Sequence, residues 1–170
     1  MKKLVILLAA FLGFGIAVSA QPKAVGARLE GFGALGFEAS YEHYFGNPNF
    51  LEVDAGLDMT GDNVGFKATG TYNFVFAQPV WTPRGSWSWY AGPGFTLGAV
   101  SWESDDRSDN HDKTKAMFGF VGQVGLEYTF WFPLQISADI RPIIGIIDDD
   151  FYSDGFANGF IPTISVRYSF

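Results

Sequence analysis

The chain has 170 residues, with 11 Lys and Arg against 18 Asp and Glu, which gives a formal net charge of −7 at pH 7. The chain contains no cysteine, which excludes a disulfide framework and thiol chemistry. Its acidic net charge argues against nucleic acid as a partner, because phosphate binding needs a basic surface. Aromatic residues make up 18% of the chain, charged residues only 17%, and there are 21 glycines, a composition that suits many strands with tight turns and an apolar exterior.

The first twenty residues have the organisation of a secretory signal peptide. Lys2 and Lys3 precede an apolar run over 4–18, and small residues follow up to Ala20. We predict cleavage after Ala20, which leaves 21–170 as one domain. An uncleaved membrane anchor is the alternative, but about fifteen apolar residues are short for a spanning helix. Cleavage removes two of the 11 basic residues, so the exported chain has a formal charge of 9 minus 18, or −9.

Eight later segments alternate apolar and polar side chains, the period of two that a strand with two different faces produces. Each is about ten residues long, close to the length of a tilted strand that crosses a bilayer. Turn residues such as those at 46–49 separate the segments, and two longer polar loops are expected at 101–115 and 148–158. The predicted strands cover 24–33, 35–45, 51–59, 66–74, 87–98, 118–130, 134–146 and 161–170.

Three prolines, Pro93, Pro142 and Pro162, lie inside these segments. Proline cannot donate to a strand ladder, and a closed barrel has no edge on which a missing donor is harmless. We therefore expect bulges at these positions, or strands that end earlier.

Eight strands on short connections predict an all-β fold, an eight-stranded antiparallel up-and-down barrel. A water-soluble barrel of the lipocalin type would turn its apolar face inward. A transmembrane β-barrel is favoured because the apolar faces are heavily aromatic, because the aromatic residues gather at strand ends as two interfacial girdles, and because both long acidic loops lie at the end opposite the termini. Turning the sheet inside out would expose about twelve charged groups to lipid, at a cost of up to ~2–4 kcal/mol for each cation near the midplane. The summed cost would exceed a typical folding stability of ~5–15 kcal/mol.

The charged side chains of the strands then face the interior, which in an eight-stranded barrel is just wide enough for side chains to fill. Buried charges must pair or become neutral. We expect a paired network near mid-height, around Arg28, Asp54, Asp139 and Arg141, that plugs the lumen, with surplus acids near the wet ends. The predicted lumen charge network is Arg28, Glu30, Glu38, Glu42, Glu52, Asp54, Asp58, Lys67, Glu127, Asp139, Arg141 and Arg167.

Three glycines of the fifth segment, Gly92, Gly94 and Gly98, also face inward in this arrangement. We predict a packing role for them, in which they admit bulky neighbours such as Tyr44 and Tyr90, because strand glycines commonly mark close approach. A local cavity is the alternative.

The last strand places Ile164, Val166, Tyr168 and Phe170 on one face, and the sequence stops on that aromatic residue. This pattern resembles the closing strand of bacterial outer-membrane barrels, in which it is read as an assembly signal by the barrel-assembly machinery. Over 21–170 the chain resembles small eight-stranded outer-membrane proteins of the OmpA-transmembrane-domain and OmpX type, through its pattern rather than through a shared motif. The resemblance implies a cell outer membrane location, outer-membrane lipid and lipopolysaccharide as partners, short periplasmic turns and extracellular loops.

The function predicted from this resemblance is structural or surface interaction, with the acidic loops 101–115 and 148–158 presented to an extracellular ligand. A narrow passive channel for small solutes is the alternative. A lipid A-modifying enzyme is the third hypothesis, and it needs a histidine with a serine and an acid. The exported chain offers only His43, which faces lipid, and His111, in a loop rich in Asp and Ser. We therefore predict neither catalysis nor a cofactor.

The second acidic loop contains the only candidate for a metal site. Asp148, Asp149, Asp150 and Asp154 offer oxygen ligands suited to Ca²⁺ or Mg²⁺. They lack the spacing of a defined calcium loop, and a run of charges is usually solvated. We expect no discrete metal site, with divalent ions bridging these carboxylates to lipopolysaccharide phosphates as the alternative.

Overall fold

The computed structural model describes residues 22–31, 35–46, 48–60, 63–102, 113–147, 150–154 and 162–170. The predicted signal peptide, His111, Asp148 and Asp149 lie outside these residues. The described part forms ten strands, all paired antiparallel. They are β1 (Lys23–Glu30), β2 (Leu35–Tyr44), β3 (Phe50–Thr60), β4 (Asn63–Ala77), β5 (Ser86–Trp102), β6 (Lys113–Thr129), β7 (Gln135–Ile140), β8 (Ile143–Ile147), β9 (Asp150–Asp154) and β10 (Pro162–Ser169).

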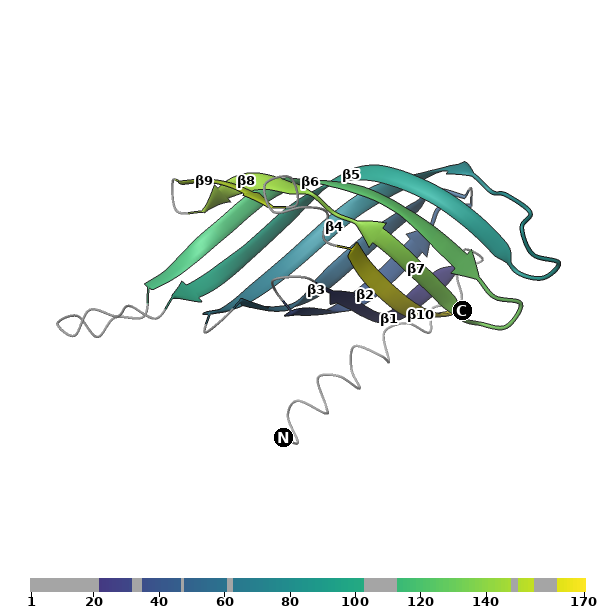
Figure 1. Cartoon of the computed structure of the whole chain (residues 1–170), viewed down its shortest axis with the longest axis horizontal. Coiled ribbons are helices and arrows are strands. Elements are labelled where there is room, and N and C mark those ends of the chain that lie inside the picture. The colour runs from purple at the N-terminus through teal and green to yellow at the C-terminus, as the bar shows by residue number, and fades with distance from the viewer. Residues whose placement is uncertain are drawn as a thin grey trace, which may run out of the picture.

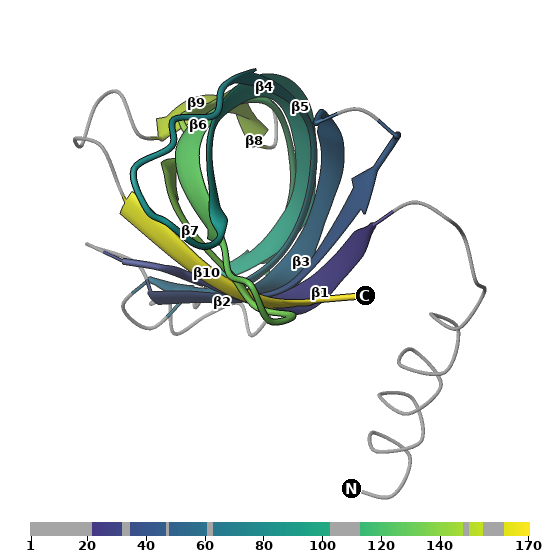
Figure 2. The same cartoon turned by 90° about the vertical axis from the view of Figure 1, so that its right-hand side faces the viewer.

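The sheet closes on itself. Its order is β5-β4-β3-β2-β1-β10-β7-β6, and β5 also pairs with β6, which completes the cylinder that Figure 2 shows end-on. β8 continues β7 along β6, and β9 pairs with β8 on the side where β10 pairs with β7, so the ten described strands occupy eight positions around the barrel (Figure 1). The predicted all-β, eight-stranded antiparallel up-and-down barrel is confirmed. Among the described residues, no helix is both long and apolar enough to cross a membrane.

The three prolines are accommodated in three different ways. Pro142 interrupts the expected seventh strand: β7 ends and β8 begins on either side of Arg141 and Pro142, whose carbonyl accepts the Gly122 N–H at 3.0 Å. Pro162 is the first residue of β10, where the missing N–H is tolerated. Pro93 lies within β5, and the pairing of β4 with β5 passes from Thr71–Gly94 to Phe74–Ala91 without a rung at Pro93.

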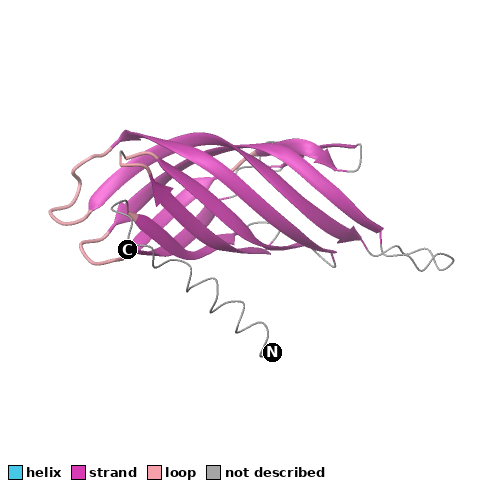
Figure 3. Cartoon of the chain, turned by 180° about the vertical axis from the view of Figure 1, so that it is seen from behind, coloured by secondary structure: helices cyan, strands magenta, loops and turns pink. Residues whose placement is uncertain are grey.

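Several strands are longer than the predicted ten residues. β4 has 15 residues, and β5 and β6 have 17 each, so the pair Trp102–Lys113 lies within the expected loop 101–115. β9 lies within the expected loop 148–158, where it forms a hairpin with β8. A 17-residue strand extends about 56 Å at ~3.3 Å per residue. Even when tilted, as in Figure 3, such a strand exceeds the ~30 Å of a hydrocarbon core, so these hairpins are long enough to project beyond it.

Alternate side chains give the barrel an apolar exterior and a polar interior. Phe120 is 63% exposed and Leu97 58% exposed, whereas Arg28 and Glu52 are completely buried. This distribution is the reverse of that in a water-soluble barrel, as predicted. Phe50 departs from the expectation that aromatic residues at strand ends form exterior girdles, because it is completely buried inside the barrel.

The first and last strands are neighbours. Val166 of β10 lies opposite Ala27 of β1, and the backbones of Lys23 and Phe170 exchange hydrogen bonds of 2.8 and 3.0 Å. The exterior face of this closing strand carries the four side chains of the predicted assembly signal, all exposed: Ile164, Val166, Tyr168 and Phe170.

Candidate functional site: the charged interior

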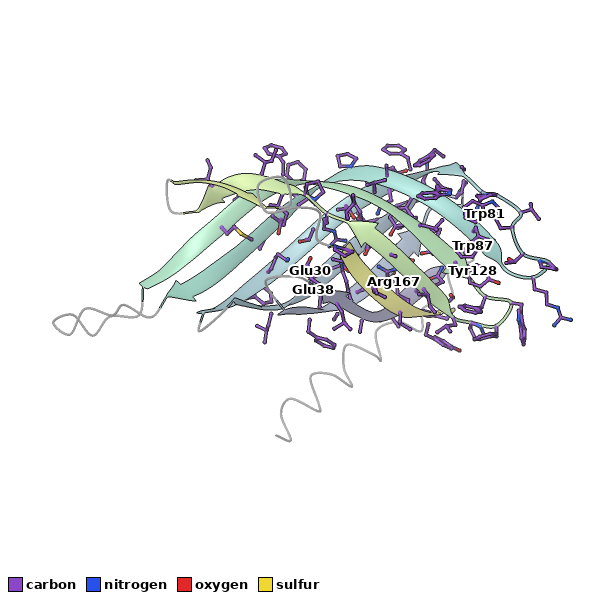
Figure 4. All side chains as sticks on the ribbon, in the orientation of Figure 1. Glu30, Glu38, Trp81, Trp87, Tyr128 and Arg167 are labelled. Atoms are coloured by element: carbon purple, nitrogen blue, oxygen red, sulfur yellow. The ribbon has the colours of Figure 1, made fainter. Side chains whose placement is uncertain are left out.

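The structure places the predicted network residues in the interior of the barrel, on seven of its eight strand positions. The side chain of Asp58 lies outside the described part, although its backbone belongs to β3. Glu30 is partly exposed, with its carboxylate within the interior, and Figure 4 shows Glu30, Glu38 and Arg167 between the walls. The fully or almost fully buried members are Arg28, Glu38, Glu42, Glu52, Asp54, Lys67, Glu127, Asp139, Arg141 and Arg167.

Glu52 is the centre of this network. Its Oε1 accepts hydrogen bonds from Arg28 Nη1 at 3.0 Å, from Arg141 Nη2 at 3.1 Å and from Arg167 Nη2. Its Oε2 accepts one from Gln123 Nε2 at 2.9 Å. Three guanidinium groups, from β1, from β10 and from the residue directly after β7, therefore converge on one buried carboxylate. The sequence pattern placed Glu52 in the interior but did not single it out.

Arg28 also pairs with Asp139, in the bidentate geometry that makes arginine–carboxylate contacts strong. Its Nη1 donates to Asp139 Oδ2 at 2.9 Å, and its Nη2 contacts Oδ1. Thr163 supports the pair by donating to Asp139 Oδ1 at 2.8 Å. These contacts join the neighbouring strands β1, β10 and β7, at the place where the first and last strands of the chain meet.

Arg141 lies at the break between β7 and β8, where its side chain points inward. Its Nη2 donates to Asp54 Oδ2 at 2.6 Å, and its Nη1 lies 3.8 Å from Glu38 Oε2. The four residues expected near mid-height therefore form two pairs, Arg28–Asp139 and Arg141–Asp54, and the pairs are connected through Glu52.

On the side of the long hairpins, Lys67 connects two acids. Its Nζ donates to Glu30 Oε2 at 2.6 Å and lies 3.6 Å from Glu38 Oε1. Since Glu38 also lies 3.6 Å from the Nε of Arg28, this group continues the central network toward that end.

On the side of the short turns, two acids meet at one tyrosine. Tyr44 Oη lies 3.0 Å from Glu127 Oε1 and 3.2 Å from Glu42 Oε2, and it accepts a hydrogen bond of 3.0 Å from Gln135. Glu42 is also paired with Arg167, whose Nη1 is 2.8 Å from its Oε1. Ion pairs and hydrogen bonds thus extend through the interior from Lys67 to Tyr44.

An aromatic layer crosses the interior beside this group, and the sequence analysis missed its central member, Phe50. Phe50 packs between Tyr44 and Tyr90, with ring centroids 5.2 and 5.1 Å apart, and Tyr90 Oη donates to Asp139 Oδ2 at 3.2 Å. The signal was present, because Phe50 has the same parity as Glu52 and Asp54. Only the assumed start of the strand at residue 51 left it out.

Close approach explains the inward glycines. A Cβ on Gly92, Gly94 or Gly98 would overlap backbone atoms of β4, so these glycines do mark close approach, but of the β4 backbone and not of the expected rings of Tyr44 and Tyr90. The glycine that admits the Tyr90 ring is one the sequence did not indicate, Gly125, where a Cβ would lie 2.5 Å from that ring and from Asp139 Cβ.

Of the residues considered for catalysis and metal binding, the structure describes His43, Asp150 and Asp154. His43 lies on the exterior, with its Nδ1 3.4 Å from Tyr41 Oη and its ring against Phe45. Asp150 and Asp154 are the end residues of β9. Within the described residues, no group of three or more His, Asp or Glu side chains is arranged to hold a metal ion.

Together the closed barrel, its apolar exterior and its charged interior define the fold of the small outer-membrane β-barrels. In particular, the chain is similar to the N-terminal β-barrel domain of Pseudomonas aeruginosa OprF, with a TM-score of 0.67 and 13% identity over 88% of this chain and 97% of that one. It is also similar to a major outer membrane protein from Thermus thermophilus, with a TM-score of 0.52 and 14% identity over 89% of this chain and 100% of that one. No protein-family model and no curated protein matches the sequence.

Proposed function

We propose that the chain is an integral outer-membrane β-barrel whose interior is plugged by charged side chains, and that its role is structural or one of surface interaction. Membrane insertion is supported by the fold and by exposed side chains such as Phe118, Phe120 and Ile164, which suit hydrocarbon better than water. A cleaved signal peptide ending at Ala20 and recognition of the last strand by the barrel-assembly machinery belong to the same proposal.

The observation that carries the plug is the set of contacts that span the barrel. β3 and β7 are four positions apart in the ring of eight, and Arg141, directly after β7, reaches Glu52 and Asp54 on β3. β2 and β6 are also four positions apart, and Tyr44 meets Glu127 between them. A solute would have to break contacts at both levels, and removing one partner from a buried pair typically costs ~3–5 kcal/mol.

The surface role follows from the contrast between the two ends. One end has the connections 45–49, 78–85 and 130–134, whereas the β5–β6 and β8–β9 hairpins extend the other. In the proposed orientation these hairpins face the cell exterior, where they meet lipopolysaccharide and an extracellular ligand. The acidic loops at their tips include residues outside the described part, so the ligand is proposed only as a class of surface partner.

A narrow channel is the second candidate, and the charge balance of the interior favours it. Seven described acids, Glu30, Glu38, Glu42, Glu52, Asp54, Glu127 and Asp139, face four bases, Arg28, Lys67, Arg141 and Arg167. An open path lined by this surplus would prefer cations.

Single-channel recording in planar bilayers decides between the two. The plug predicts no steady conductance for the native chain and openings for Arg141→Ala, whereas Arg84→Ala, which changes an exposed arginine outside the interior, stays silent. A steady native conductance that changes on Arg141→Ala overturns the plug. A chain that folds as a monomer without detergent overturns membrane insertion.

The absence of catalysis is a proposal with its own test. His43 faces outward, away from the acids of the interior. We expect identical lipid A mass spectra from cells with and without the protein, and a mass change that depends on His43 or His111 would establish an enzyme.

A further inference from the structure

An aromatic cluster lies on the outside of the barrel at the end with the short connections. The turn 78–85 folds against the exterior of β5, so that the ring centroid of Trp81 is 5.4 Å from that of Trp87 and 6.3 Å from that of Trp89. Trp87 in turn packs on Tyr128 of β6 at 4.6 Å. Figure 4 shows Trp81, Trp87 and Tyr128 gathered at this end.

The same turn fixes a guanidinium group at the edge of the cluster. The Arg84 carbonyl accepts hydrogen bonds from the hydroxyls of Tyr128 at 2.7 Å and Thr82 at 2.9 Å. Gly85, with a φ of 74°, turns the chain tightly against β6. The Arg84 Cζ then lies 5.6 Å from the ring centroid of Trp131 in the next turn, a cation–π contact.

The charge around this cluster suits an anion. The segments 45–50, 76–87 and 128–134 contain no Asp or Glu, although the chain as a whole is acidic. The nearest acids of the strands, such as Glu127, are buried in the interior. Within the described part of the chain, Arg84 has no acidic partner, so its charge is available to a ligand on the outer face.

We propose that Arg84 and the surrounding rings form a binding site for the phosphate of an anionic phospholipid in the adjacent leaflet. The guanidinium offers paired donors to phosphate oxygens, and the indole rings of Trp81 and Trp131, which are 56% and 64% exposed, contact the glycerol and the first acyl carbons. The attraction of a single arginine to anionic lipid corresponds to about a fivefold preference of the site for an anionic over a zwitterionic phospholipid. The site rests on the proposed membrane insertion.

Tryptophan quenching measures this preference, because four of the five tryptophans, Trp81, Trp87, Trp89 and Trp131, lie at this end. The purified chain is reconstituted in phosphatidylcholine vesicles with increasing fractions of brominated phosphatidylglycerol or brominated phosphatidylcholine. We expect phosphatidylglycerol to compete about fivefold better in low salt. Arg84→Gln should reduce the ratio to about one, and Arg84→Lys, which keeps the charge, should retain a preference.

Lys23→Gln is the matched control, because it removes a cation from the same end on β1, away from the cluster. It should leave the ratio unchanged. A native ratio of one, a ratio unchanged by Arg84→Gln, or an equal loss with Lys23→Gln overturns the site. A failure of membrane insertion gives a different result, because brominated phosphatidylcholine then quenches none of the variants.

Discussion

Arg141 and Glu52 come from opposite sides of the barrel and meet in its interior, where Arg141 Nη2 donates to Glu52 Oε1 at 3.1 Å. The two residues are 89 positions apart in the sequence, so only barrel closure brings them together. Both are shielded from water, which strengthens their attraction but makes each one costly without the other. The stability of the interior therefore depends on these two charges keeping each other as partners.

Removing the cation alone tests this dependence. Arg141→Met leaves Asp54 without its hydrogen-bonded cation and Glu52 with two instead of three, and we expect a loss of ~3–5 kcal/mol in the free energy of unfolding. Urea titration in lipid vesicles, followed by tryptophan fluorescence, measures it. The double variant Arg141→Met, Asp54→Asn should recover part of the loss, because it removes the unpaired charge as well.

The control is Arg84→Met, at an exposed arginine, which should change stability by less than ~1 kcal/mol. Equal losses in the Arg141 and Arg84 variants would show that the interior pair is not the cause.

Removing the central anion should have the opposite electrical effect. Glu52→Gln keeps the shape of the side chain but leaves the guanidinium groups of Arg28, Arg141 and Arg167 without their shared carboxylate. We expect openings whose preference for cations is weaker than that of the Arg141→Met openings, because Glu52→Gln removes an interior anion and Arg141→Met removes an interior cation. Reversal potentials in a KCl gradient distinguish them. The same selectivity in both variants would contradict control of the pore by this network.

The period of two was sufficient to predict the barrel and the interior position of its charges. Arg28, Glu38 and Arg141 each stand on the polar face of a predicted segment, and each side chain is buried in the structure. Alternation is a local property, and a charged residue at the middle of an aromatic-rich strand has only the interior available. The error of face at Phe50 came from the assumed strand boundary and not from the period.

The pairings themselves could not be predicted. The convergence of three arginines on Glu52 depends on the relative register of strands that are not adjacent in sequence, and alternation does not encode register. The break at Pro142 was expected only as some irregularity. The inward position of Arg141 was predicted, but the sequence did not indicate that the strand would end before it and resume as β8, nor that β9 would fold back on β8.

Gly125 provides a test of packing that does not involve charge. A methyl group at this position would lie 2.5 Å from the Tyr90 ring and from Asp139 Cβ, so Gly125→Ala should displace the aromatic layer and destabilise the barrel by ~1–3 kcal/mol. Gly70→Ala is the matched control, because a Cβ there meets nothing within 4 Å. Urea midpoints of the two variants in the same vesicles give the comparison. An equal effect of both substitutions would show that strand propensity, and not contact with Tyr90, determines the result.

The exposed aromatic at the end of the last strand tests the assembly signal separately from stability. Phe170 is 49% exposed and its backbone already pairs with Lys23, so its ring adds little to the interior of the folded barrel. We expect Phe170→Ser to slow insertion by purified assembly machinery several-fold, measured by the shift between folded and unfolded bands on unheated gels, while spontaneous insertion into detergent micelles changes little. Phe45→Ser is the control, because Phe45 has similar exposure, 44%, but precedes a turn and does not belong to the closing strand. If both variants slow assisted insertion equally, the machinery senses exterior apolarity in general. If only Phe170→Ser slows assisted insertion, the machinery recognises the last strand, because both substitutions remove an exposed ring but only Phe170 belongs to the exterior face of that strand.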